Sequence, residues 1–266
     1  MCIFLYVKND TVPAKHVITV AMKKHIHNHT QKSNYDFSFA HCKEGFDKHI
    51  QHSIRGYDNL LQDVVAYSRY FIEADTNVVD IGCSTGKLIQ LLIEENQDHC
   101  TDAQYIGVEL ASGFHKDLEN RHRSICSQHA WAKLLFVHDD IRNYDFNNCS
   151  FVSSIFTLQF MSFRHRLEVL NRIYQGLNQG AALIFAEKTV ANHARIQEML
   201  TFNYYDYKRQ HFQPYQIMTK EKNLRHMMKP NTWTEILHNL QHAGWQAENI
   251  QPFWCNHMFV GAIAVK

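Results

Sequence analysis

Residues 77–86, NVVDIGCSTG, are the most informative stretch of this sequence for the fold. Val78, Val79 and Ile81 are apolar and β-branched, as expected for a strand that is covered on both faces. Gly82 and Gly86 bracket a tight turn, and the helical pattern KLIQLLI follows at residues 87–93. The stretch therefore predicts a buried strand, a glycine loop and a helix, an arrangement that turns backbone N–H groups towards a ligand.

The residues of this loop narrow the choice of ligand. A phosphate-binding P-loop requires Ser or Thr where Leu88 stands, and the dinucleotide fingerprint requires a second glycine where Ser84 stands. What remains is D-x-G-x-x-x-G, with Asp80 directly before the turn. A carboxylate there suits a cationic amino-acid ligand better than a pyrophosphate. The alternative is a buried parallel strand with an ordinary glycine turn.

Further acids follow the other predicted strands. Glu109 ends the strand at residues 105–109, Asp140 follows residues 134–137, and Glu187 follows residues 181–186. Strands that alternate with helices predict an α/β fold with a doubly wound parallel sheet, which binds ligands at the carboxyl ends of its strands. In nucleoside-binding folds of this kind an acid after the second strand accepts both ribose hydroxyls, and Glu109 is the candidate for this role.

The composition narrows the classes of protein to which this chain can belong. Lys and Arg number 27 and Asp and Glu 26, so no global positive charge indicates nucleic acid, and direct nucleic-acid binding stays open. Seven scattered cysteines without a C-x-x-C pair disfavour a disulfide framework and a zinc site, and they favour a reducing cytoplasm. No apolar run is long enough to span a membrane, so we expect no membrane partner. We interpret His25, His27 and His29 as solvated and predict no metal site.

The chain divides into an extension and one domain. We expect residues 1–33 to be a poorly specified extension and residues 34–266 to form the α/β domain, with its fourth strand at residues 151–160. Residues 190–230 mix aromatic and basic side chains and predict a helical cap over the strand ends. This mixture is consistent with stacking of nucleic-acid bases, with closure over an anionic small molecule, or with a solvated helix that has a packed aromatic face. Strands near residues 245–253 and 258–265 complete a sheet of seven strands.

The glycine loop resembles motif I of the class I S-adenosylmethionine (SAM)-dependent methyltransferases. Six segments together resemble the carboxy-SAM synthase family, in the same order and with nearly the same spacing. They are SIRGYDN (residues 53–59), DIGCS (80–84), Asp140-Ile141-Arg142, FTLQF (156–160), IYQGLN (173–178) and Glu187-Lys188. The similarity runs from about Tyr35 to the end of the chain. It implies a Rossmann-like class I methyltransferase fold and a homodimer.

The resemblance also implies a reaction. Members of the family convert SAM and prephenate into carboxy-SAM and phenylpyruvate, and the product serves to modify a wobble uridine in tRNA. The positively charged sulfur of SAM acidifies its methyl group, which captures the carboxyl group that prephenate loses. A cation must then hold the new carboxylate.

The family's site residues transfer to this sequence one at a time. By resemblance the cofactor-binding residues are Tyr57, the loop residues Gly82, Cys83, Ser84 and Gly86, the pair Glu109 and Leu110, and the adenine-binding pair Asp140 and Ile141. Glu109 replaces the family's aspartate and Leu110 the asparagine after it. Two departures concern the reaction: Ile155 stands where the family has an asparagine, and the arginine that holds the carboxylate falls on Lys222 when no gap is allowed after Lys208-Arg209. Lysine keeps the positive charge but loses the bidentate geometry.

Three hypotheses follow from these residues. The first is a cytosolic enzyme of the carboxy-SAM synthase type, with SAM as its cofactor, prephenate as its second substrate and Lys222 as the carboxylate anchor. The second is a conventional SAM-dependent methyltransferase on the same scaffold, which needs no carboxylate anchor. The third is a SAM-binding module without catalysis.

Overall fold

One sheet of nine strands forms the centre of the protein. The structure, a computed structural model, describes residues 2–6, 19–23 and 45–266, the first two ranges as strands only. The order across the sheet is β2-β1-β5-β4-β3-β6-β7-β9-β8. The strands are β1 (Cys2–Tyr6), β2 (Thr19–Lys23), β3 (Asn77–Ile81), β4 (Gln104–Val108), β5 (Lys133–Val137), β6 (Cys149–Ile155), β7 (Leu177–Lys188), β8 (Ile250–Asn256) and β9 (Phe259–Val265).

The seven strands from β3 to β9 confirm the predicted mostly parallel sheet. β3, β4, β5, β6 and β7 pair in parallel, whereas β9 is antiparallel to both β7 and β8. Two further strands, β1 and β2, lie within residues 1–33, for which the sequence predicted no element. β1 pairs with β5 in antiparallel orientation and so extends one edge of the sheet.

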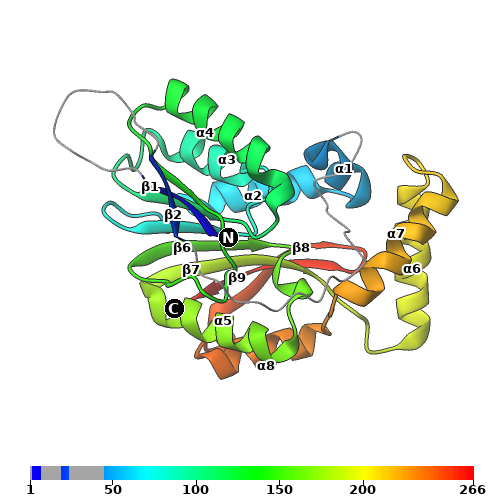
Figure 1. Cartoon of the computed structure of the whole chain (residues 1–266). Helices are drawn as coiled ribbons and strands as arrows, with labels where there is room; N and C mark the ends of the chain where they lie inside the picture. The colour runs from blue at the N-terminus through cyan, green and yellow to red at the C-terminus, as the bar shows by residue number, and fades with distance from the viewer. Residues whose placement is uncertain (1, 7–18, 24–44) are drawn as a thin grey trace.

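Helices cover both faces of this sheet, as predicted (Figure 1). On one face lie α2, α3 and α4, and on the other lie α5 and α8, while α1, α6 and α7 gather beyond one end of the strands. The helices are α1 (Phe46–Ser53), α2 (Tyr57–Ser68), α3 (Lys87–Asn96), α4 (His115–Gln128), α5 (Phe163–Gly176), α6 (Ala194–Lys208), α7 (Pro214–Met227) and α8 (Trp233–Ala243). Residues 45–266 also contain the short 3-10 helices η2 (Ser112–Phe114), η3 (Leu158–Phe160) and η4 (Ala247–Asn249).

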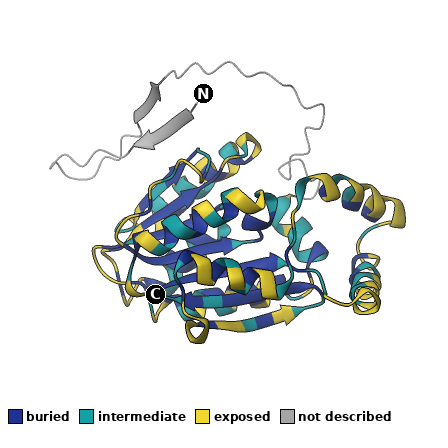
Figure 2. Ribbon diagram, turned by 90° about the horizontal axis from the view of Figure 1, so that it is seen from below, coloured by how far each residue is buried: buried dark blue, intermediate teal, exposed yellow. Residues whose placement is uncertain are grey.

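The sheet has a hydrophobic core on each face. Successive side chains of β3 divide between the two cores, with Val78 in one and Val79 in the other, and both are fully buried. Burying each such aliphatic side chain contributes about 1.5–3 kcal/mol. Figure 2 shows that the strands are mostly buried and that the outer faces of the helices are exposed. The central strand is therefore a rigid support for the loop that follows it.

The fourth predicted strand is shorter than the sequence suggested. We expected it to run over residues 151–160, but β6 ends at Ile155. Phe156 has a φ of 60°, a left-handed conformation that a strand cannot contain, and the chain continues into η3. The hydroxyl of Thr157 then donates to the carbonyl of Ile81 at 2.9 Å. The early end of β6 thus places FTLQF beside the end of β3.

Residues 190–230 form the helical cap that the sequence predicted, and α6 and α7 are its two helices. α7 begins with Pro214 in its first turn and with a reciprocal capping box between Gln213 and Gln216. The cap leaves and re-enters the sheet domain at one place, because Thr189 and Asn231 form a parallel bridge and the N–H of Val190 donates to the carbonyl of Asn231 at 3.0 Å. Within the described part of the chain, no helix has the length and apolar character needed to cross a membrane.

Candidate functional site

The loop after β3 has the backbone of a ligand-binding turn. Gly82, Ser84 and Gly86 have φ values of 69°, 52° and 73°. A Cβ atom on Gly82 would lie 2.4 Å from Oγ1 of Thr157, and one on Gly86 would lie 2.8 Å from Cζ of Phe136. Both positions therefore require glycine for space as well as for conformation. Without Cβ atoms at these two positions, the loop packs closely against Thr157 and Phe136.

Asp80 is a buried carboxylate beneath this loop. It is 3% exposed and accepts a hydrogen bond from the hydroxyl of Ser153 at 2.7 Å. Burial raises the pKa of Asp80 to about 7, the Ser153 hydrogen bond opposes the shift, and the charge of Glu109 adds to it. Tyr57 and Cys83 line the same small pocket as Asp80. A ligand that carries a positive charge here would favour the ionised form of the acid.

Glu109 connects the end of β4 to the glycine loop. Its two carboxylate oxygens accept the N–H groups of Ser84 at 2.9 Å and of Ala111 at 2.7 Å. Burial raises the pKa of Glu109, and these backbone donors oppose that shift. Each oxygen retains a second lone pair, so the carboxylate can also accept hydroxyl groups of a ligand. The neighbouring Leu110 is 67% exposed at the rim.

A cavity of about 340 Å³ lies on one side of Glu109. Glu109, Leu110, Asp140 and Ile141 line it together, and these are the residues that the sequence assigned to the ribose and the adenine. The Asp140 carboxylate is paired with Arg142, whose Nε donates to it at 2.9 Å. Although partial burial acts in the opposite direction, the hydrogen bonds from Arg142 lower the pKa of Asp140. Asp140 is therefore an ionised acceptor that is already fixed in place.

A second cavity of about 220 Å³ lies on the other side, beneath the cap. Its floor consists of Gly82, Ser84 and Glu109, and it shares Gly82, Glu109, Thr157 and Phe160 with the first cavity. One elongated ligand can therefore extend through both. The walls are mostly apolar and come from α1 and the residues after it, from η2, from the end of β6, from the cap and from the start of β9. They include Phe46, Ile50, Ile54, Phe114, Ile155, Phe156, Tyr204, Leu224, Met228 and Phe259.

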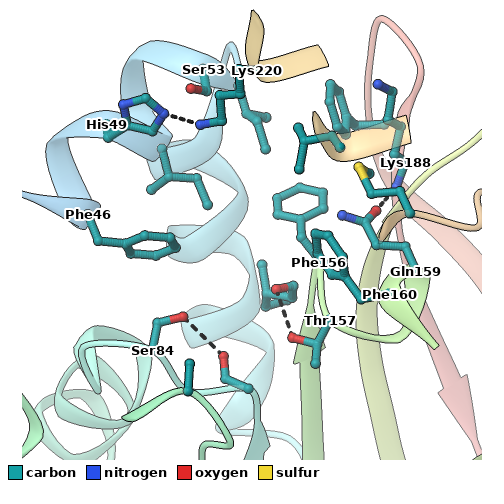
Figure 3. Close-up of a pocket in the computed structure, with 18 of the residues that line it drawn as sticks. Phe46, His49, Ser53, Ser84, Phe156, Thr157, Gln159, Phe160, Lys188 and Lys220 are labelled. Carbon is teal, nitrogen blue, oxygen red and sulfur yellow. Dashed lines mark hydrogen bonds between the residues drawn. The ribbon is translucent and has the colours of Figure 1, made fainter. Parts of the chain in front are cut away.

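The roof of this second cavity is basic. We use the word roof for His49 of α1, Lys220 of α7 and Lys188 at the end of β7, all of which line the cavity (Figure 3). Nζ of Lys220 and Nε2 of His49 are hydrogen-bonded to each other. Figure 3 shows this pair at the opposite end of the cavity from Ser84. The site thus has an acidic floor and a basic roof.

Lys188 belongs to a cluster of three charges. Glu221 of α7 lies 3.4 Å from Nζ of Lys188 and 3.1 Å from Nζ of Lys208, and it is 6% exposed. Although burial opposes ionisation, the two lysines hold the pKa of Glu221 below its usual value. Two positive charges and one negative charge leave this cluster with a net positive charge next to the cavity.

Lys222, which the sequence assigned to the site, and Glu187, which the sequence placed at the ligand-binding edge of the sheet, lie elsewhere. Lys222 is exposed on α7 and is not among the residues that line the cavity. Successive residues of a helix are separated by about 100°, so a position two residues from Lys220 lies on nearly the opposite face. Glu187 lies on the other side of the sheet, where it lines a small cavity with Arg166, and burial raises its pKa to about 7 against the effect of Arg166. Its position at a strand end does not bring it to the cleft.

Sequence reasoning gave no role to three residues that the structure places in the cavity. His49 was one of 19 histidines, without a motif to distinguish it. Lys220 was only one base among many in the cap, and Thr157 belonged to FTLQF without an assigned contact. The helical periodicity of Ile217, Glu221 and Leu224, all buried, could have indicated which face of α7 points inwards.

Among residues 45–266 no group of three or more His, Cys, Asp and Glu side chains is arranged to hold a metal ion. The described cysteines Cys83, Cys100, Cys126, Cys149 and Cys255 are free thiols. His25, His27 and His29 lie outside the described residues.

Comparison with known proteins agrees with this geometry. Residues 79–183 match the model of a family described as a methyltransferase domain. A structure titled as a putative O-methyltransferase from Nostoc punctiforme superimposes with a TM-score of 0.57 at 14% identity, over 86% of this chain and 59% of that chain. Fold and matched domain together define a class I methyltransferase-type protein, and such proteins are SAM-dependent transferases.

The relatives identify the family within this class. A carboxy-S-adenosyl-L-methionine synthase from Staphylococcus epidermidis is 30% identical over 236 residues, which are 87% of this chain and 97% of the relative. One from Hamiltonella defensa is 32% identical over 76% of this chain and 78% of the relative. The chain belongs to the carboxy-S-adenosyl-L-methionine synthase family, and it is a transferase that uses SAM.

Proposed function

We propose that this enzyme converts SAM and prephenate into carboxy-SAM, phenylpyruvate and water. The observation that carries the proposal is the charge distribution of the cavity beneath the cap, with Glu109 at its floor and the lysines of the roof opposite. The acidic floor suits the positively charged sulfur of SAM, and the basic roof suits a carboxylate. An apolar wall between them suits the six-membered ring of prephenate.

The residues of the floor have the chemistry needed to hold SAM. In this proposal Asp80 pairs with the amino group of the methionine part, which lies against the loop from Gly82 to Gly86. Glu109 accepts the ribose hydroxyls, and the adenine lies in the neighbouring cavity between Asp140, Ile141 and Leu110. Tyr57 and Cys83 close the pocket around Asp80. When bound, SAM supplies a methyl group made acidic by the adjacent sulfonium.

The chain's own residues then have three tasks. Asp80 and Glu109 fix the orientation of the cofactor, so that its methyl group is directed into the cavity beneath the cap. The apolar walls exclude water, which strengthens the electrostatic interactions inside. The basic roof holds the carboxylate that is transferred.

One observation favours a second candidate, a methyltransferase that acts on an anionic acceptor. Ile155 lines both the cavity beneath the cap and the pocket of Asp80, at the position where the family has an asparagine. An aliphatic side chain cannot donate the hydrogen bond that an amide would provide. A methyl transfer to an acid of suitable shape would require the same floor and roof.

Mass spectrometry of the adenosyl product separates the two candidates. The protein is incubated with SAM, with and without prephenate. We expect a product heavier than SAM by one carboxyl group, formed only when prephenate is present. Adenosylhomocysteine that appears only with an acceptor would support the methyltransferase. Bound SAM that stays unchanged under all these conditions would support a binding module without catalysis.

We also propose, from the family resemblance, that the protein is a cytoplasmic homodimer whose product serves the modification of a wobble uridine in tRNA. Light scattering on the full chain tests the dimer. Analysis of modified uridines in cells that lack the gene tests the role of the product.

A further inference from the structure

We propose that the side-chain amide of Gln159 recognises the keto oxygen of an α-keto acid in the cavity beneath the cap. The inference rests on the function proposed above, because the pyruvyl side chain of prephenate is an α-keto acid. It concerns a neutral oxygen of the second substrate and leaves the binding of SAM to the floor.

Gln159 lies at the cavity on the short helix η3. It lines the cavity and is only 4% exposed. Among the described residues that line this cavity, Gln159 alone carries a side-chain amide. Water does not compete strongly for the hydrogen bonds of such a buried group, so a ligand that satisfies it is favoured over one that does not.

The backbone N–H of Lys188 fixes the orientation of this amide. It donates to Oε1 of Gln159 at 2.7 Å, as the dashed line in Figure 3 shows. Because a backbone N–H can only donate, the amide atom that faces it is the oxygen. Nε2 is turned from Lys188 towards the inside of the pocket (Figure 3), and no described residue accepts a hydrogen bond from it. The amide therefore presents N–H donors to a ligand in the cavity.

The backbone around Gln159 is held by a buried arginine. Nε of Arg166 donates to the carbonyl of Leu158 at 3.1 Å, and Nη2 of Arg166 donates to the carbonyl of Lys229 at 2.6 Å. The N–H of Lys229 in turn donates to the carbonyl of Gln159 at 2.7 Å. Arg166 is 2% exposed, so water has little access to these bonds. The position of Gln159 is therefore fixed by its backbone as well as by its side chain.

The serine and threonine hydroxyls of the cavity are less suited to this contact. The hydroxyl of Thr157 donates to the carbonyl of Ile81 at 2.9 Å, and that of Ser84 donates to the carbonyl of Gly82 at 3.3 Å. Oγ of Ser53 is buried within the protein and has almost no accessible surface. The amide of Gln159 remains the better placed neutral donor.

The charges next to Gln159 favour an α-keto acid. The N–H that fixes the amide belongs to Lys188, whose side chain is part of the basic roof. A carboxylate near the roof and a neutral oxygen near Gln159 would therefore lie close together in one ligand. In an α-keto acid these oxygens are carried by adjacent carbon atoms. A neutral amide suits the keto oxygen, because it donates a hydrogen bond without adding a charge to the cluster of Lys188, Glu221 and Lys208.

A cycle of two ligands and one substitution tests the contact. Phenylpyruvate is compared with 3-phenylpropionate, the same acid without the keto oxygen, by calorimetry on the full chain saturated with adenosylhomocysteine. Gln159→Met has a similar volume and no amide. It should weaken the binding of phenylpyruvate by about tenfold, the typical effect of losing one buried hydrogen bond. It should change the binding of 3-phenylpropionate by less than about twofold.

Gln159→Glu separates the ligand contact from the structural contact with Lys188. The glutamate retains an oxygen that accepts the N–H of Lys188, but it has an acceptor in place of the amide nitrogen. The loss of affinity should be at least about tenfold larger for phenylpyruvate than for 3-phenylpropionate, because the added charge repels both acids alike. Gln175→Glu, at an exposed position of α5, introduces the same charge and should leave both affinities unchanged. Affinity for adenosylhomocysteine and thermal melting show that each variant is folded.

The outcomes for this inference and for the proposed function differ. Equal losses for the two ligands in both variants of Gln159 would assign it a purely structural role and overturn the inference. An unsubstituted protein that does not bind phenylpyruvate, or that binds the two acids equally well, also overturns it. A loss at Gln159 that depends on the keto oxygen, without formation of carboxy-SAM from SAM and prephenate, overturns the proposed function and supports the inference.

Discussion

The Glu109 carboxylate at the end of β4 accepts the N–H of Ser84 in the glycine loop at 2.9 Å. Glu109, which we propose as a ligand-binding side chain, thus also fixes the loop that we propose for the same ligand. The second oxygen of Glu109 accepts the N–H of Ala111, so one carboxylate holds two segments of backbone. Loss of this group removes a direct ligand contact and the order of its surroundings together.

We therefore expect Glu109→Ala to weaken SAM binding by at least about tenfold, since it removes charge-assisted hydrogen bonds. Calorimetric titration with SAM measures the effect. Glu119→Ala, an exposed acid on α4, is the matched control and should leave the affinity unchanged. Unaltered affinity in Glu109→Ala would refute the assignment of the floor.

Gly82 allows a comparison between backbone strain and steric clash. Gly82→Ala and Gly180→Ala both place a Cβ at positive φ, 69° and 82°, but only the first meets another side chain, Thr157. Positive φ costs about 1–2 kcal/mol in each variant. We expect Gly82→Ala to lower the free energy of unfolding by more than Gly180→Ala does and to impair SAM binding as well. Urea denaturation measures the stability difference, and equal losses would show that Thr157 yields without cost.

The raised pKa of Asp80 predicts that SAM binding releases a proton. Its pKa of about 7 without a ligand means that Asp80 is largely protonated at pH 6. Pairing with the amino group of SAM favours the ionised form, so binding should release up to about one proton at pH 6 and almost none at pH 8. Calorimetry in buffers of different ionisation enthalpy measures this release. The release should be absent from Asp80→Asn, and its persistence there would assign the proton to another group.

The same pKa shift has a consequence for stability. The folded protein binds the Asp80 proton more tightly than the unfolded chain does, so this contribution to stability is fully present below the unfolded pKa and is lost as the pH rises through about 7. The free energy of unfolding should therefore fall less between pH 5 and pH 8 in Asp80→Asn than in the unsubstituted protein. Denaturation curves at the two pH values test this, and equal slopes would contradict it.

The cluster of Lys208, Glu221 and Lys188 should be essential to the cap. Glu221→Gln leaves the buried Lys208 without its counter-ion, a change that typically costs about 3–5 kcal/mol. Thermal unfolding measures the loss. The neighbouring Lys222→Ala should have an effect within about 0.5 kcal/mol, and the double variant Lys208→Met/Glu221→Leu should recover part of the stability. An unchanged thermal stability of Glu221→Gln would show that water replaces the missing charge.

Sequence reasoning was most accurate where the periodicity was strong. The strand before the glycine loop was predicted correctly, because an apolar run before a glycine is a local signal. The predicted end of the fourth strand was wrong, because the left-handed conformation of Phe156 follows from its packing and not from its residue type. The misplaced Lys222 came from counting positions without gaps, where an error of one or two residues turns a helix face from the cavity to solvent.

The remaining parts of the site depend on contacts between distant segments. Ser153 and Asp80 are 73 residues apart in the chain, and His49 and Lys220 are 171 residues apart. No local pattern encodes such pairs. The acids at the ends of β3 and β4 and the acid after β5 could be predicted because parallel strands bring their carboxyl ends to one edge of the sheet, and Glu187 shows that this rule does not determine which face a side chain takes.

The bridge between Thr189 and Asn231 makes the cap a self-contained insertion in the sheet domain. Both of its ends leave the sheet domain at adjacent positions, so a short turn could connect them without moving β7 or α8. The floor, which we propose as the cofactor site, and the cap, which contributes to the roof, can therefore change independently. Exchange of residues 190–230 between relatives would transplant the acceptor preference of one enzyme onto the cofactor site of another.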